Sequence, residues 1–117
     1  MFIQLKHKEL DVYKITKEMI KEMYKISLKL PIEERFNMVS QIRRAALSVK
    51  LNLAEGATRK SMQERKRFLE ISRGSIVEID AAIETSVDLE YFTVKELELL
   101  GSLLNRCFAM LSKMIDL

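Results

Sequence analysis

Apolar residues recur every three or four positions along most of the chain, a spacing that is typical of α-helices packed on one side. Pro31 and Gly56 interrupt the pattern. The predicted helices span about residues 9–28, 32–55, 61–90 and 93–116. The sequence therefore predicts an all-α fold, in which connections of a few residues favour antiparallel neighbours. This fold is an antiparallel up-down-up-down four-helix bundle, forming one domain over residues 1–117.

Short motifs mark where the predicted helices start and stop. Ser61 followed by Glu64, and Thr93 followed by Glu96, are capping-box patterns, in which each side chain bonds to the backbone N–H of the other residue. They predict the starts of the third and fourth helices. Gly56 is predicted to stop the second helix in a left-handed conformation, which other residues adopt only at a cost.

Each predicted helix carries an apolar stripe that we assign to the core. The first helix contributes Val12, Ile15, Met19, Met23 and Ile26. The second contributes Val39, Ile42, Ala46, Val49 and Leu53. The third contributes Phe68, Ile71, Ser75, Ile79, Ala82, Ser86 and Leu89, beside an edge of small residues, Gly74, Ala81 and Thr85, that would permit close helix approach. The fourth contributes Leu97, Leu100, Leu104, Phe108, Leu111 and Ile115.

Two of the predicted helices carry a second apolar stripe. In the second helix it consists of Phe36, Leu47, Leu51 and Ala54. In the fourth it consists of Leu103, Cys107, Met110 and Met114. The core of a solitary bundle need not bury both stripes of a helix, so the pattern predicts contact between copies of the chain, that is, a homo-oligomer.

Charge is distributed unevenly along the chain. Residues 1–60 carry thirteen Lys and Arg against seven Asp and Glu, whereas residues 61–117 carry seven against ten. The net charge of +3 is small. A molecule with one basic and one acidic part can attract a polyanion, or can stack basic against acidic surface in a self-assembly.

Two groups of cations are candidates for binding phosphate. Lys14, Lys17, Lys21 and Lys25 line up opposite the core stripe of the first helix, either as a solvated face or as a stripe that tracks phosphates. The second group consists of Arg59, Lys60, Arg65, Lys66 and Arg67. Cations in the first turns of a helix oppose its dipole, so this group requires either a local carboxylate, such as Glu55 or Glu64, or an external phosphate.

Residues for enzyme chemistry are scarce. The one histidine, His7, precedes the first predicted helix, so we expect neither a histidine-based triad nor a His/Cys metal cluster within one chain. Cys107 is the one cysteine, which excludes an internal disulfide. We expect Cys107 to be a buried, inert thiol. No catalysis and no cofactor are expected. Because no apolar stretch approaches the roughly 20 residues that span a bilayer, and no signal-peptide core is present, we expect a cytoplasmic protein with no membrane contact.

The run QIRRAALSVKLNLAEGATRKS resembles the four-helix-bundle proteins encoded in 23S ribosomal-RNA intervening sequences, as do LPIEERF before it and RFLEISRGSIVEID after it. The resemblance extends from about Leu10 to Ile115. Its most specific residues are Arg43, Arg44, Asn52, Ala54, Glu55, Gly56, Arg59, Phe68, Gly74 and Ser75. Departures from the family pattern are Lys50, Leu53 and Ser72.

The resemblance implies an antiparallel four-helix bundle that assembles into a homopentameric ring. A relative in that family, the accessory variability protein of diversity-generating retroelements, works with a reverse transcriptase and binds nucleic acid through basic surface. Two functions follow as hypotheses. One is a scaffold that binds RNA or DNA through the nine cations of the two groups above. The other is a structural or protein-binding adaptor ring, for example an accessory of a reverse transcriptase-like polymerase.

Other signature residues are interpreted as architecture. We predict a buried or interfacial hydrogen-bonded network that ties the second helix to the third or to the next subunit, because charges near apolar stripes need partners. Its predicted members are Arg43, Arg44, Asn52, Glu55, Arg59 and Glu78, with Gly56 and Gly74 as structural glycines. Within this network, Glu78 is a candidate partner for an arginine of the second helix.

Overall fold

A computed structural model describes all residues, 1–117, and contains four α-helices, three short 3-10 helices and no strand. The elements are η1 (Lys6–Glu9), α1 (Asp11–Ser27), η2 (Ile32–Glu34), α2 (Met38–Ala57), α3 (Met62–Asp88), η3 (Lys95–Leu97) and α4 (Glu98–Ile115). The predicted all-α fold is confirmed. The helices α2 and α4 begin later than predicted, because the residues after Pro31 and Thr93 first form the separate turns η2 and η3.

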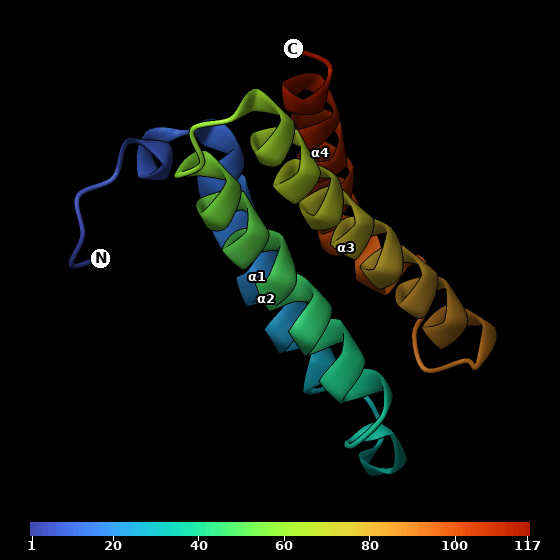
Figure 1. The fold of residues 1–117 in the computed structure, drawn as a ribbon. Coiled ribbons are helices and arrows are strands. Elements are labelled where there is room, and N and C mark those ends of the chain that lie inside the picture. The colour runs from blue at the N-terminus through green and yellow to red at the C-terminus, as the bar shows by residue number, and fades with distance from the viewer.

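Each helix packs against the next helix in the sequence, and α1 also packs against α4. In Figure 1, α1 and α2 form one side of the bundle and α3 and α4 the other, while both chain termini lie toward the end where α2 connects to α3. At the opposite end, the Tyr91 hydroxyl donates a hydrogen bond to Glu34 Oε2 over 2.9 Å. The α1–α2 and α3–α4 connections therefore lie together. No helix combines the length and apolar character needed to cross a membrane.

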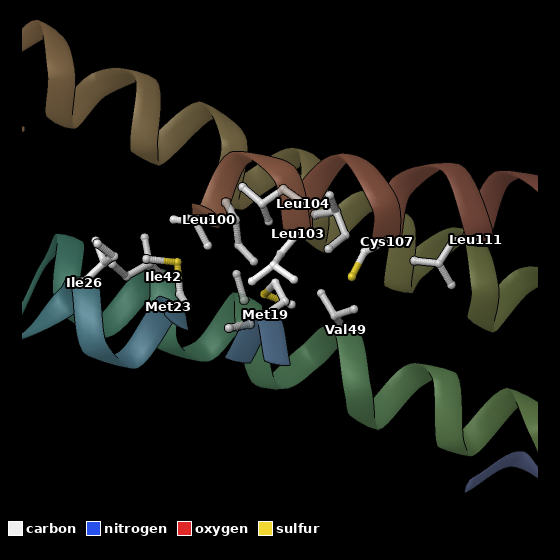
Figure 2. Close-up of a cluster of buried hydrophobic side chains, with 14 of the residues drawn as sticks. Met19, Met23, Ile26, Ile42, Val49, Leu100, Leu103, Leu104, Cys107 and Leu111 are labelled. Carbon is white, nitrogen blue, oxygen red and sulfur yellow. The ribbon is translucent and has the colours of Figure 1, made fainter. Parts of the chain in front are cut away.

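The core lies between the α1–α2 side and α4. In Figure 2, side chains of α1 and α2 point toward the apolar side chains of α4. The labelled members are Met19, Met23, Ile26, Ile42, Val49, Leu100, Leu103, Leu104, Cys107 and Leu111. All ten are buried. Those that belong to α1 and α2 were predicted to be core residues, and this prediction is confirmed for them. Cys107 Sγ lies 3.9 Å from Thr16 Oγ1, and burial raises the pKa of this thiol, so the predicted buried thiol is confirmed.

The predicted core stripe of α3 is partly wrong. Ile71 is 43% exposed and Leu89 is 50% exposed, whereas Leu69 and Ser72 are buried. The reason is a hydrogen bond: Ser72 Oγ donates to the carbonyl oxygen of Val49 in α2 over 2.7 Å. A serine that bonds to the neighbouring helix can occupy a core position, and apolar periodicity does not reveal it.

The prediction that α4 leaves its second stripe uncovered is wrong for Leu103 and Cys107, while Met110 and Met114 are half-buried. Leu103 is 8% exposed and Cys107 is fully buried, because α1 packs on one side of α4 and α3 on another. Phe108, which was assigned to the core, is instead 41% exposed. The second stripe of α2 does remain at the surface, since Leu47 is 42% exposed and Leu51 is 57% exposed.

The two signature glycines differ from their predicted roles. Gly56 is not in a left-handed conformation and lies inside α2, where an added Cβ would be 2.8 Å from Phe68 Cβ. It therefore permits close approach of α3 and does not stop α2. Gly74 faces open space, so the predicted small-residue edge of α3 is not a helix contact within the chain.

The Thr93–Glu96 capping box forms in full, but just before η3 and not at the start of α4, and at Ser61 one of the two predicted bonds forms. The backbone N–H of Glu64 donates to Ser61 Oγ at the start of α3. Thr93 and Glu96 bond reciprocally, the N–H of Thr93 to Glu96 Oε1 over 3.0 Å and the N–H of Glu96 to Thr93 Oγ1 over 3.3 Å. The hydrogen bond from the Thr93 backbone lowers the pKa of Glu96. Side chains thus satisfy N–H groups that a helix start leaves without partners.

Candidate nucleic-acid interface

The α2–α3 connection and the first turns of α3 form one end of the bundle, which we call the basic end (residues 50–67). It holds six Lys and Arg against two Glu. Lys60, Arg65 and Arg67 are exposed and Lys66 is half-buried. None of these four has a carboxylate within 4.0 Å, since ion pairs in the structure involve other cations. Their charges therefore act together on whatever approaches this end.

Arg59 is the one cation of the basic end with a local carboxylate. Its Nη2 lies 2.9 Å from Glu55 Oε1, and its guanidinium stacks over the ring of Phe68 at 5.0 Å. Arg65 Nε donates a hydrogen bond to the backbone carbonyl of Arg59. Glu64, the other proposed carboxylate, pairs with none of the cations. The two alternatives posed for this cluster therefore separate: Arg59 is neutralised locally, and the other four cations are not.

The predicted lysine stripe lies on α1, where Lys14, Lys17, Lys21 and Lys25 are all exposed. Only Lys21 is paired, with Glu18 at 3.6 Å. Both side chains of this pair are more than half exposed, and such surface pairs contribute little to stability. The stripe is thus available to an anion along most of α1.

Sequence reasoning missed a second cationic cluster beside this stripe. Lys17 Nζ and Lys50 Nζ both lie over the ring of Tyr13, at 5.9 and 5.5 Å. The amino group of Met1 has a lowered pKa, first because of hydrogen bonding with Lys8 and also because of the charges of Lys8, Lys50 and Lys17. Lys17 and Lys50 come from different helices, so only their packing could bring them together.

A cleft of about 700 Å³ lies between Tyr13, over which Lys17 and Lys50 lie, and Glu55, which pairs with Arg59. Its walls come from the N-terminal residues, from the C-terminal half of α2 and from Phe68 of α3. Lys8 lines it on one side and Glu55, the partner of Arg59, on the other. The cleft is thus lined by residues that contact cations of both regions, although Lys8 is the one cation that lines it directly.

His7 is used for packing. It is 8% exposed and meets the ring of Tyr13 edge-on, with centroids 5.1 Å apart. Burial, and then the charge of Lys8, lowers its pKa. No group of three or more His, Cys, Asp or Glu side chains lies close enough to hold a metal ion.

The predicted network of signature residues is not one network. Arg43 Nε donates to Ser27 Oγ over 2.8 Å, and its guanidinium stacks over Tyr24 at 4.8 Å, so Arg43 ties α2 to α1 and not to α3. Arg44 does reach α3: its Nη2 lies 3.8 Å from Glu78 Oε2, which confirms that Glu78 pairs with an arginine of the second helix. This pair is more than half exposed on both sides.

The hydrogen bonds of the remaining members lie within α2 or at its end, but two of these residues also connect to α3. Arg59 stacks over Phe68, and Ser48, the partner of Asn52, accepts from Ser75 Oγ over 3.0 Å. Asn52 Nδ2 donates to the carbonyl oxygen and the hydroxyl of Ser48, and Glu55 accepts from Arg59. Since α-helical residues four apart face the same side, these bonds need no second helix. The expected single network is therefore corrected to several separate contacts, of which those of Arg44, Arg59 and, through Ser48, Asn52 join α2 to α3 as predicted.

Residues 8–113 match the family described as 23S rRNA-intervening sequence protein. The chain belongs to this family. This match confirms the family resemblance that the signature residues indicated. No curated protein matches the sequence. Among solved structures, an S23 ribosomal protein family member of unknown function from Bacteroides thetaiotaomicron is similar at a TM-score of 0.82. It is 21% identical, and the match covers 91% of this chain and 99% of that one, which shows a shared fold.

In this intervening-sequence protein, the departures from the family pattern lie at structural contacts. Lys50 supplies the cation over Tyr13 that joins the α1 stripe to α2. Ser72 makes the buried hydrogen bond between α3 and α2, and Leu53 is fully buried. Lys50 is therefore the departure that changes the charge of the candidate interface.

Proposed function

We propose that this protein is a non-enzymatic cytoplasmic scaffold, an up-down-up-down four-helix bundle whose copies form a homopentameric ring and bind RNA or DNA through basic surface. The observation that carries the proposal is that seven of the nine candidate cations, all except Lys21 and Arg59, have no carboxylate within 4.0 Å. Unpaired exposed cations retain their full attraction for phosphate, and phosphate contacts supply most sequence-independent affinity.

The charge polarity of the molecule supports binding at one end. Residues 80–98, near the α3–α4 connection, hold six Asp and Glu against one Lys, the reverse of the balance at the basic end. A polyanion is therefore attracted to one end of each copy and repelled from the other. Repetition of the basic end around a ring would raise the avidity for a long nucleic acid without any new contact.

Exposed apolar residues support self-assembly. Leu47 and Leu51 stand on the outer face of α2, and Phe36 precedes it with 86% of its surface exposed. The family resemblance points to a pentamer, and a closed ring requires a repeated contact between two different faces of the chain. The family description refers to 23S ribosomal RNA, and RNA is therefore the first polyanion to test.

The test measures affinity for an RNA duplex at about 50 and 200 mM salt. If six phosphates are contacted, affinity falls about a thousandfold across this range. Replacing Lys60 and Arg67 by Ala removes two unpaired cations of the basic end, and each lost phosphate contact lowers the salt slope by about one. The matched control replaces Lys29 and Lys95 by Ala, which removes the same charge near the opposite end. A response that is flat with salt, or equal losses in both variants, contradicts the proposal.

A second candidate is an adaptor ring that binds protein, for example a reverse transcriptase-like polymerase, with no direct role for nucleic acid. The apolar surface that the bundle leaves exposed on α3 and α4, including Val77 and Leu99, favours it. Co-purification with a polymerase, together with no RNA affinity at low salt, supports this candidate over the first.

A further inference from the structure

The N-terminal segment Met1–Leu5 is apolar but is not packed into the bundle. Phe2 is 88% exposed and Ile3 is 66% exposed. In Figure 1 the segment extends sideways from η1, and Met1, Phe2 and Ile3 line an open cleft together with Leu51 of α2 and Phe68 of α3. Two lysines, Lys6 and Lys8, follow it directly. Exposure of large apolar side chains to water is unfavourable, so a surface that covers them is stabilising.

A groove between the C-terminal half of α3 and the N-terminal half of α4 has the complementary character. Its volume is about 420 Å³. Its apolar lining consists of Ile83, Val87, Val94, Leu97 and Leu104. Its charged lining residues are Asp80, Glu84, Asp88 and Glu98, and it contains no Lys, Arg or His.

The groove continues along α3 and α4 into a second hollow of about 330 Å³, which shares Asp80, Gly101, Leu104 and Asn105 with the first. The second hollow adds Val77, 53% exposed, and Phe108, 41% exposed. We call the two together the α3/α4 groove. It offers an extended apolar floor beside carboxylates, which suits an extended apolar segment followed by cations.

We propose that the N-terminal segment of one copy docks in the α3/α4 groove of a second copy, with Phe2 and Ile3 on the apolar floor and Lys6 and Lys8 beside the carboxylates. The choice of occupant follows from charge: every charged residue that lines the groove is a carboxylate, whereas the segment bears the amino terminus and is followed by Lys6 and Lys8. The inference rests on the self-assembly proposed above and names the contact that would link one copy to the next.

The segment does not reach the groove of its own chain. It lies beside the C-terminal half of α2, where Met1, Phe2 and Ile3 line the same cleft as Leu51 and Phe68. The groove is on the α3–α4 side, toward the other end of the bundle. Five extended residues span at most about 18 Å, whereas the bundle is 44 Å long. The contact therefore joins two copies through unlike surfaces, the kind of contact from which rings are built.

The experiment is disulfide trapping in the full-length chain. The double variant Ile3→Cys/Asn105→Cys places one thiol on the segment and one at the groove, both at exposed positions, while native Cys107 is fully buried. Under mild oxidation we expect a ladder of covalent oligomers on a denaturing gel, whereas either single variant gives dimers at most. The control Ile3→Cys/Lys21→Cys, with the second thiol on exposed α1, gives no ladder.

A charge exchange tests the electrostatic part. Lys6→Glu/Lys8→Glu in the trapping variant lowers the yield of cross-linked species by at least about tenfold, because like charges now face each other. Adding Glu84→Lys/Asp88→Lys restores the yield. Failure of the restoration overturns the proposed pairing of charges.

Light scattering on the unmodified protein separates this inference from the proposed ring. An oligomer that gives no ladder with the groove variant overturns the docking of the segment and leaves the ring intact. A ladder from Ile3→Cys/Leu47→Cys in place of the groove variant overturns it as well, since the segment then lies on α2. A monomer at micromolar concentration overturns both.

Discussion

Small residues determine how closely α2 and α3 approach. Gly56 leaves room for Phe68, and Ser75 Oγ donates to Ser48 Oγ across the two helices over 3.0 Å. Ser72 adds the bond to the Val49 carbonyl. Short hydroxyl side chains allow the backbones to come near each other while satisfying their own polar groups. The close approach of the neighbouring helix therefore limits the volume of the side chain at each of these positions.

The substitution Gly56→Ala tests this constraint. The new Cβ would meet Phe68 Cβ at 2.8 Å, and since that atom is fixed to the α3 backbone, one helix must shift. We expect the free energy of unfolding to fall by about 1–3 kcal/mol, which outweighs the roughly 1 kcal/mol by which Ala favours a helix over Gly. Chemical denaturation measures the change.

The matched control is Gly74→Ala. Nothing lies within 4 Å of a Cβ added there, so only the helix preference acts and stability rises by up to about 1 kcal/mol. Equal effects of the two substitutions, in either direction, would show that contact with Phe68 is not the reason for glycine at position 56.

At the scale of elements, the left-handed cap that the sequence placed at Gly56 occurs at the end of α3. Glu90 has φ 64°, and it is the one non-glycine residue with positive φ. The N–H of Tyr91 donates to the carbonyl of Ser86 over 2.9 Å, which is the longer bond of a Schellman motif. The turn then brings the Tyr91 hydroxyl to Glu34, joining the two connections.

Glu90→Gly is expected to stabilise the protein. Glycine adopts positive φ without the steric cost that a Cβ imposes, so we expect a gain of about 0.5–1 kcal/mol and a rise in melting temperature of roughly 3–6 °C. Glu90→Ala is the control, since it removes the carboxylate but keeps the Cβ. If alanine matches glycine in thermal unfolding, charge and not backbone conformation limits stability there.

At the scale of the whole molecule, the apolar faces that the bundle leaves exposed predict where copies of the chain contact one another. Replacing Leu47 and Leu51 by Gln should lower the mass measured by light scattering while leaving the helical content unchanged. Both residues are exposed at 42% and 57% in the single chain, so each change costs the fold little, whereas an interface that covers them loses its apolar contact.

The control for the α2 substitutions is Leu28→Gln/Leu89→Gln, at exposed leucines near the opposite end. We expect it to leave the mass unchanged. An oligomer of undiminished mass in the Leu47/Leu51 variant would exclude the outer face of α2 from the subunit contact and would favour other apolar surfaces, such as the α3/α4 groove.

Local signals in the sequence were sufficient for the elements of this fold. Helical periodicity, Pro31 and the Ser61 and Thr93 caps all depend on residues within one or two turns, and the structure contains the helices that they predict. The family signature could be recognised for the same reason, because it consists of short runs of the sequence. Four of the five unpaired cations of the basic end, Lys60, Arg65, Lys66 and Arg67, lie within residues 60–67, so their clustering also needed no fold.

Tertiary packing alone decided which faces are covered and which charges meet. Apolar periodicity could not show that Ser72 is a core residue, because its partner is a carbonyl of another helix, or that two neighbouring helices cover the second stripe of α4. Lys17 and Lys50 converge on Tyr13 from separate helices. A residue's own sequence neighbourhood determines its helical preference, whereas its burial and its charge partners depend on which distant segment lies opposite.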